Sequence, residues 1–244
     1  AGLTMPKTSS RAITSPAGTA DTMECLARVN LSEKQIKGVV KKTKACLVHG
    51  GSINLAPADD KIIEIEYPLA IDAEGQLIAS VMAKKNSVSS DYVLIDIPVG
   101  KTTKANTIGK ARQLKRWFEK VGRKLGMKVK VIITDGSQPI GRGIGPLLEA
   151  EDVMAVLRND PSAPLDLKEK SLKLAGILLE MAGQSHDGYV KAKEVLESGQ
   201  ALKKMQEIIE AQGALKRPKL GTYRFVVKTT TSGKIVEIDN LVIA

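Results

Sequence analysis

Hydroxyl side chains, one arginine and one glycine crowd together within residues 9–24, immediately before an apolar run. The start of a helix presents free backbone N–H groups and the positive end of a dipole, and both attract anions. Arg11 would add a planar fork suited to a phosphate. Four residues would add hydroxyl donors: Ser10, Thr14, Ser15 and Thr19. The segment predicts either a phosphate-ester or nucleotide cradle or an ordinary Ser/Thr-rich helix cap, in which Thr19 or Asp21 forms a capping box with Glu24.

An acidic residue ahead of a predicted helix is the second candidate for chemistry. Asp72 stands just before the helix expected over residues 74–89. Its simplest role is an N-cap that accepts hydrogen bonds from the first backbone N–H groups of the helix. The alternative role is a proton donor, which requires a shielded pocket that raises the pKa of the carboxyl group.

Two further pairs of polar residues could contact a substrate. Ser80 and Lys84 stand four apart on the same predicted helix and therefore share a face. Lys101 and Lys104 follow a predicted strand, in a loop that could contact an anion. A solvated surface is the competing interpretation of both pairs.

Apolar periodicity predicts an alternation of helices and strands. Helices are expected at residues 19–29, 32–44, 74–89, 105–125, 147–158, 166–182, 187–198 and 200–211. Strands are expected at residues 45–48, 61–66, 92–97 and 128–134. This alternation indicates an α/β fold whose mixed or mostly parallel sheet is flanked by helices. Functional residues in such sheets gather beyond the carboxyl ends of the strands.

The last thirty residues change in character. Two alternating apolar segments, 222–228 and 234–239, predict a β-hairpin that turns at Ser232-Gly233. We therefore expect an α/β core over residues 1–212, and a linker with the beginning of a β-rich domain over residues 213–244.

Composition narrows the classes of partner. The 244 residues include 37 basic and 27 acidic side chains, a formal net charge of +10 that suits either an anionic substrate or a nucleic acid. Aromatic residues make up only 3% of the chain, which disfavours the base-stacking surfaces of nucleic-acid-binding proteins. No apolar run is long enough to span a membrane. From the low aromatic content we expect no nucleic-acid partner, and from the short apolar runs we expect no membrane partner.

The cysteines and histidines exclude further classes of site. Cys25 and Cys46 are too few and too far apart for a metal or redox motif, and they are typical of a reduced, cytoplasmic protein. His49 and His186 have no metal-ligand spacing around them. We therefore expect neither a metal centre nor a Ser-His-Asp triad.

Several segments in one order resemble the thymidine and pyrimidine nucleoside phosphorylases, and most closely their archaeal relatives, the AMP phosphorylases. The most extensive matching segment is SRAITSPAGTADTME at residues 10–24. Others follow at residues 50–60 (GGSINLAPADD), 68–72 (PLAID), 80–85 (SVMAKK), 90–100, 138–141 (QPIG) and 175–181 (AGILLEM). The resemblance covers nearly the whole chain and implies the central α/β domain of that family.

The resemblance also implies an activity, the phosphorolysis of an N-glycosidic bond. In the archaeal enzymes, a nucleoside 5′-monophosphate and inorganic phosphate give the free base and ribose 1,5-bisphosphate. Carried over to this sequence, the residues that hold the nucleotide would be Ser10, Arg11, Ala12, Ile13, Thr14, Ser15 and Thr19. Asp72 would protonate the departing base, and Ser80 and Lys104 would contact substrate. Lys84 would be a further contact to the base, as in the pyrimidine enzymes.

The family pattern implies inorganic phosphate as co-substrate, no metal or organic cofactor, and a homodimer or larger homo-oligomer. Two departures from the pattern matter. Residues 64–67 contain no arginine, although thymidine phosphorylases have an arginine base contact there, and this favours a nucleotide over thymidine. The family's phosphate-binding loop and the rest of its C-terminal domain would lie outside this sequence, so we expect a piece of a longer enzyme. A pyrimidine nucleoside phosphorylase and a non-catalytic nucleotide-binding module are the alternatives.

Overall fold

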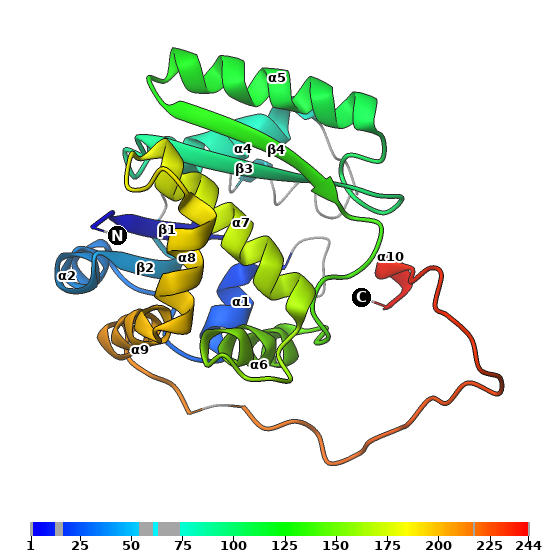
Figure 1. Ribbon diagram of the computed structural model, residues 1–244. Helices are drawn as coiled ribbons and strands as arrows, with labels where there is room; N and C mark the ends of the chain where they lie inside the picture. Colours follow the sequence, from blue (N-terminus) through cyan, green and yellow to red (C-terminus); the bar gives the residue numbers. More distant parts are fainter. Residues whose placement is uncertain (1, 13–16, 54–60, 63–73, 217, 244) are drawn as a thin grey trace.

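Figure 1 shows a computed structural model of this chain, whose described residues contain two pairs of parallel strands. The structure describes all residues except 1, 13–16, 54–60, 63–73, 217 and 244. β1 (Met5–Ser9) pairs with β2 (Ala45–His49), and β3 (Tyr92–Val99) pairs with β4 (Lys128–Asp135). Helices connect the paired strands, as parallel pairing requires. The fold is therefore α/β, as predicted.

Short helices surround the first strand pair. α1 (Thr19–Glu24) and α2 (Glu33–Thr43) lie between β1 and β2 in the sequence, and the 3-10 turn η1 (Gly50–Ile53) follows β2. Ser32 caps α2 in a capping box, because its side chain accepts from the Gln35 backbone and the Gln35 side chain accepts from the Ser32 backbone. This cap fixes where the helix begins, and thereby the connection into β2.

The second strand pair carries its own core. α5 (Ile108–Lys124) lies along one face of β3 and β4, and α4 (Glu74–Asn86) packs against α5 (Figure 1). Gly122 allows the close approach of α5 to the sheet, since a Cβ there would lie 2.1 Å from the Val129 Cγ2 atom. The most deeply buried larger side chains of this core are Met82, Val93, Leu114, Phe118 and Val131.

Four longer helices complete the described fold. They are α6 (Pro146–Leu157), α7 (Leu165–Met181), α8 (Gly188–Glu197) and α9 (Gln200–Gln212). α7 contacts β3 and also packs against α8, where a Cβ on Gly188 would lie 2.0 Å from the Gly176 carbonyl oxygen. At the end of α9, the Gln212 side chain accepts from Leu47 N and donates to the carbonyl oxygens of Leu47 and Arg28. None of the described helices is both long and apolar enough to cross a membrane.

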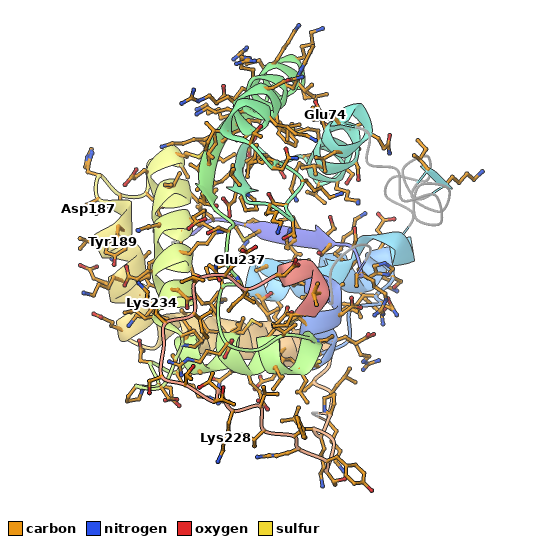
Figure 2. All side chains as sticks on the ribbon, turned by 90° about the vertical axis from the view of Figure 1, so that its right-hand side faces the viewer. Glu74, Asp187, Tyr189, Lys228, Lys234 and Glu237 are labelled. Atoms are coloured by element: carbon orange, nitrogen blue, oxygen red, sulfur yellow. The ribbon has the colours of Figure 1, made fainter. Side chains whose placement is uncertain are left out.

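The C-terminal segment does not form the predicted hairpin. Residues 222–228 and 234–239 are extended without strand pairing, and they run around the outside of the molecule to the short helix α10 (Asn240–Ile243) (Figure 1). Lys228 lies at the outer edge of this segment in Figure 2, and Tyr223 is 99% exposed. An alternating pattern gains stability only when one face is buried, and here the described residues offer neither strand a partner.

Other elements differ from the prediction in smaller ways. β1 was not predicted, because its sequence MPKTS has a proline and no β-branched run. α1 ends at Glu24 rather than at residue 29, since Ala27 leaves the helix to form a bridge with Ala214. The strand predicted over 61–66 falls almost wholly outside the described residues, and Lys61 and Ile62 are helical. The other predicted helices and strands are confirmed, with ends that move by a few residues.

Candidate functional site

The loop that joins β1 to α1 folds back on its own backbone. A Cβ on Gly18 would lie 2.5 Å from the carbonyl oxygen of Ser10 and 2.5 Å from the carbonyl carbon of Arg11, so only glycine fits there. The Asp21 carboxylate ties both ends of the loop together, because its Oδ2 atom accepts from Ala12 N at 2.7 Å and from Gly18 N at 3.0 Å. The described parts on the two sides of residues 13–16 therefore meet at the start of α1.

Arg11 pairs with the two acidic side chains of α1. Its Nη1 atom lies 2.8 Å from Asp21 Oδ1 and 2.6 Å from Glu24 Oε2, and its Nη2 atom lies 2.9 Å from Glu24 Oε1. The hydrogen bonds to Glu24 raise the pKa of Arg11 and lower the pKa of Glu24. Burial works to raise the pKa of Asp21, but the Gly18 and Ala12 backbone hydrogen bonds and Arg11 lower it overall. In this structure Arg11 fastens the loop to the helix.

α4 brings two predicted contacts against the same loop. The Lys84 ammonium group donates to Ser80 Oγ at 3.2 Å, one helical turn away. It also donates at 3.2 Å to the Oγ atom of Ser10, the residue that follows β1. Residues four apart share a helix face, so Ser80 and Lys84 were expected together. Their meeting with Ser10 is a contact over 74 positions of sequence. Three of the predicted site residues are thus brought together.

Two lysines that the sequence analysis did not single out lie beside this group. Lys7 projects from β1 and Lys85 follows Lys84 on α4, and both are half-buried. Their side chains interact with each other, and burial followed by the charges of Lys7 and Lys84 lowers the pKa of Lys85 to about 8. Burial and the Lys84 charge also lower the pKa of Lys7. The adjacent lysines at 84 and 85 were the signal in the sequence that could have indicated this group. Its third member, Lys7, lies on β1, a strand that was not predicted.

The remaining predicted residues divide into two groups. Ala12, Thr19 and Lys104 are described and exposed, with Thr19 as the first residue of α1 and Lys104 in the turn after β3. Asp72, Ile13, Thr14 and Ser15 lie outside the described residues. The roles assigned to all of them in substrate binding and catalysis stay predictions.

A cleft of about 420 Å³ opens on the other side of the first turn of α1. Thr19 and Thr22 border it, and Glu149 and Asp152 of α6 face them. Both carboxylates already accept hydrogen bonds: Glu149 from Thr22 Oγ1, and Asp152 from the backbone of Gly143. An anion would therefore find acidic side chains in this cleft, whereas the side of the loop that faces α4 offers lysines.

The described part of the chain offers no metal centre. No group of three or more His, Cys, Asp and Glu side chains within it is arranged to hold a metal ion. The chemistry available around Ser10 is that of hydroxyl and ammonium donors, which bind anions and polarised carbonyl oxygens.

Comparison with known proteins finds no matching family model, but it finds close relatives. The chain is 53% identical to a protein named "Putative thymidine phosphorylase" from a Bradyrhizobium species, over 98% of this chain and 48% of that protein. It is 55% identical to a protein of the same name from Rhodopseudomonas palustris, over 98% of this chain and 47% of the relative. A "Putative thymidine phosphorylase 1" from an Acidovorax species is 52% identical, over 100% of this chain and 48% of the relative. The chain thus spans about half the length of these proteins, and over nearly all of its own length it is a relative of the nucleoside phosphorylases.

Proposed function

We propose that the protein containing this chain is a phosphorylase that cleaves the N-glycosidic bond of a nucleoside or nucleotide with inorganic phosphate. The observation that carries the proposal is the junction of Lys84 with Ser10 and Ser80 at 3.2 Å each. This junction joins the glycine-containing loop and helix α4, the two segments in which the family resemblance expects substrate contacts. The names of the relatives support the same class of reaction.

The proposed chemistry follows from the charges that develop as the bond breaks. Positive charge builds on the sugar and negative charge on the base, so a proton donor at the base accelerates departure by roughly 10²- to 10⁴-fold. Asp72 is the proposed donor. Ser10, Ser80 and Lys84 would hold the substrate still, which aligns the glycosidic bond for attack by phosphate. A homodimer or larger homo-oligomer is part of the same proposal.

AMP is the proposed substrate, with adenine and ribose 1,5-bisphosphate as products. Two features favour a nucleotide: residues 64–67 contain no arginine for a thymine contact, and the ammonium group of Lys84 on α4 contacts Ser10 of the loop. The second candidate is thymidine, which the names of the relatives favour. The two candidates share the catalytic steps and differ only in the 5′-phosphate, the sugar and the base.

A release assay separates the candidates. Full-length protein is incubated with AMP, CMP, UMP, GMP, adenosine or thymidine, with and without inorganic phosphate, and the free base is measured by chromatography. We expect phosphate-dependent release that is fastest with AMP, and a loss of most of it in Lys84→Ala. The matched control is Lys34→Ala, at an exposed position of α2, which should behave like the parent protein. Faster release from thymidine would favour the second candidate, and no phosphate-dependent release from any substrate would refute the proposal.

A further inference from the structure

The outer face of helix α5 carries a continuous line of basic side chains. The helix contains seven basic residues and a single acidic one, Glu119. Four of the basic residues are exposed and stand four positions apart, and we call them the basic row: Arg112, Arg116, Lys120 and Lys124. Residues at this spacing are neighbours on one side of a helix. At a rise of about 1.5 Å per residue, the basic row is roughly 18 Å long.

The basic row faces away from the protein core. The buried residues of α5 lie on the opposite side of the helix, at Ala111, Leu114, Phe118 and Gly122. Figure 1 shows α5 at the outer edge of the fold, and Figure 2 shows nitrogen-tipped side chains that project outward from this helix. The row is therefore open to a partner.

The carboxylates near α5 pair with lysines outside the basic row. The Lys110 Nζ atom lies 3.7 Å from Glu74 Oε1, and the Lys115 Nζ atom lies 3.8 Å from Glu119 Oε1. Among the described residues, no carboxylate forms an ion pair with a member of the row. The positive charge of the row is thus left for an external anion.

The stability of α5 does not explain this charge pattern. Like charges four positions apart repel each other, and the basic row contains three such pairs in succession. The first turn of the helix contains Lys110 and no acidic residue, although the positive end of the helix dipole favours acidic side chains there. Within the row, only Lys124 gains from the dipole, because it lies in the last turn.

A polymer of phosphates suits the basic row better than a membrane does. A helix binds a bilayer surface by inserting an apolar face, and the apolar face of α5 is already buried in the core. Guanidinium groups, of which the row has two, bind phosphate oxygens through paired hydrogen bonds. Double-stranded DNA carries about one charge per 1.7 Å of its axis, hence roughly ten over the length of the row.

We infer that the basic row of α5 is a docking surface for double-stranded DNA, which it binds through the phosphate backbone without reading the base sequence. The scarcity of aromatic residues disfavours base stacking, but contact with phosphates requires only charge. An exposed helix fits the major groove of DNA, whereas the major groove of double-stranded RNA is too narrow. The inference does not depend on the proposed reaction.

Fluorescence anisotropy of labelled DNA duplexes tests the inference on full-length protein without substrate. The row variant is Arg112→Gln/Arg116→Gln, which keeps good helix formers and relieves like-charge repulsion. The control variant, Lys34→Gln/Lys41→Gln, removes the same charge from two exposed positions of α2. We expect DNA affinity to fall roughly ten-fold or more in the row variant, because hydrogen bonds between charged groups are lost, and to stay at the parent value in the control.

The dependence of affinity on salt gives a second measurement. Each phosphate contact contributes about −0.9 to the slope of log K against log salt concentration, so the slope of the row variant should be shallower by roughly 2. A variant that keeps the charges, Arg112→Lys/Arg116→Lys, should keep the parent slope. Duplexes of unrelated sequence should bind the parent protein equally.

Three results would overturn the inference. They are equal DNA affinity of the row and control variants, tighter binding of the parent protein to phosphatidylserine vesicles than to DNA, and tighter binding to an RNA duplex than to DNA. Base release is not part of this assay. A protein that releases no base but loses DNA affinity in the row variant alone would therefore support the docking surface while refuting the proposed function.

Discussion

Replacing Lys85 with methionine should stabilise the ligand-free protein at neutral pH. The pKa of Lys85 lies at about 8 instead of 10.5, first because of burial and then because of Lys7 and Lys84. One pKa unit corresponds to about 1.36 kcal/mol, so keeping Lys85 charged at pH 7 costs the folded state up to about 3 kcal/mol. Lys85→Met removes this cost and keeps the apolar stem in place. We therefore expect a higher free energy of unfolding for the variant.

The stability difference between the parent protein and Lys85→Met should depend on pH. Between pH 8 and 10.5 the unfolded chain holds the Lys85 proton and the folded protein has released it, so the stability of the parent protein rises with pH in this window. The advantage of the variant should be full at pH 7 and should disappear by about pH 10.5.

The assay is thermal unfolding of the full-length parent and Lys85→Met proteins at pH 7 and at pH 10. Lys34→Met serves as the control and should match the parent protein at both values of pH. A variant that melts below the parent at pH 7 would refute the reasoning, because the charged Lys85 side chain would then stabilise the folded protein.

Three other predictions concern the loop and the proposed proton donor. Asp72→Asn should lower kcat for base release by roughly 10²- to 10⁴-fold and change the affinity for AMP little; an unchanged kcat would remove Asp72 from the mechanism. Gly18→Ala should abolish substrate binding, since its Cβ would meet the backbone of Arg11, whereas Gly75→Ala, with nothing within 4 Å, should bind normally in an isothermal titration with AMP. Asp21→Asn should lower the Tm at pH 7; because the pKa of Asp21 is lowered on folding, this loss should fade as pH falls through and below 3.8, and a loss that persists in acid would contradict the ion pair with Arg11.

Local sequence signals predicted the elements whose stability is local. The helix over 33–43 follows from Ser32 and Gln35, which complete their capping box within a single turn. The strand 92–99 follows from a continuous apolar run, in which Val93, Ile95 and Ile97 are buried and the residues between them are half-buried. The interactions that stabilise these elements involve residues close in the sequence, so the sequence alone is enough to predict them.

The parts that could not be predicted depend on distant residues. β1 is a strand because β2 offers a parallel partner 40 positions away, from Met5 to Ala45 and from Ser9 to His49. Conversely, Phe225 sits in a good strand pattern but is 91% exposed, since the described residues supply no face to cover it. The candidate site shows the same division. The helix spacing predicted that Ser80 and Lys84 meet, but their contact with Ser10 depends on the pairing of β1.

The side-chain amide of Gln212 occupies the edge of β2 at which a further strand could pair. It gives Leu47 the donor and the acceptor that a neighbouring peptide group would give, at 2.8 Å and 3.0 Å. Two residues further along β2, the carbonyl oxygen of Val29 accepts from His49 N at 2.9 Å. An unprotected sheet edge invites pairing with other chains and aggregation. Gln212, at the end of α9, therefore helps to prevent β2 from pairing with a strand of another molecule.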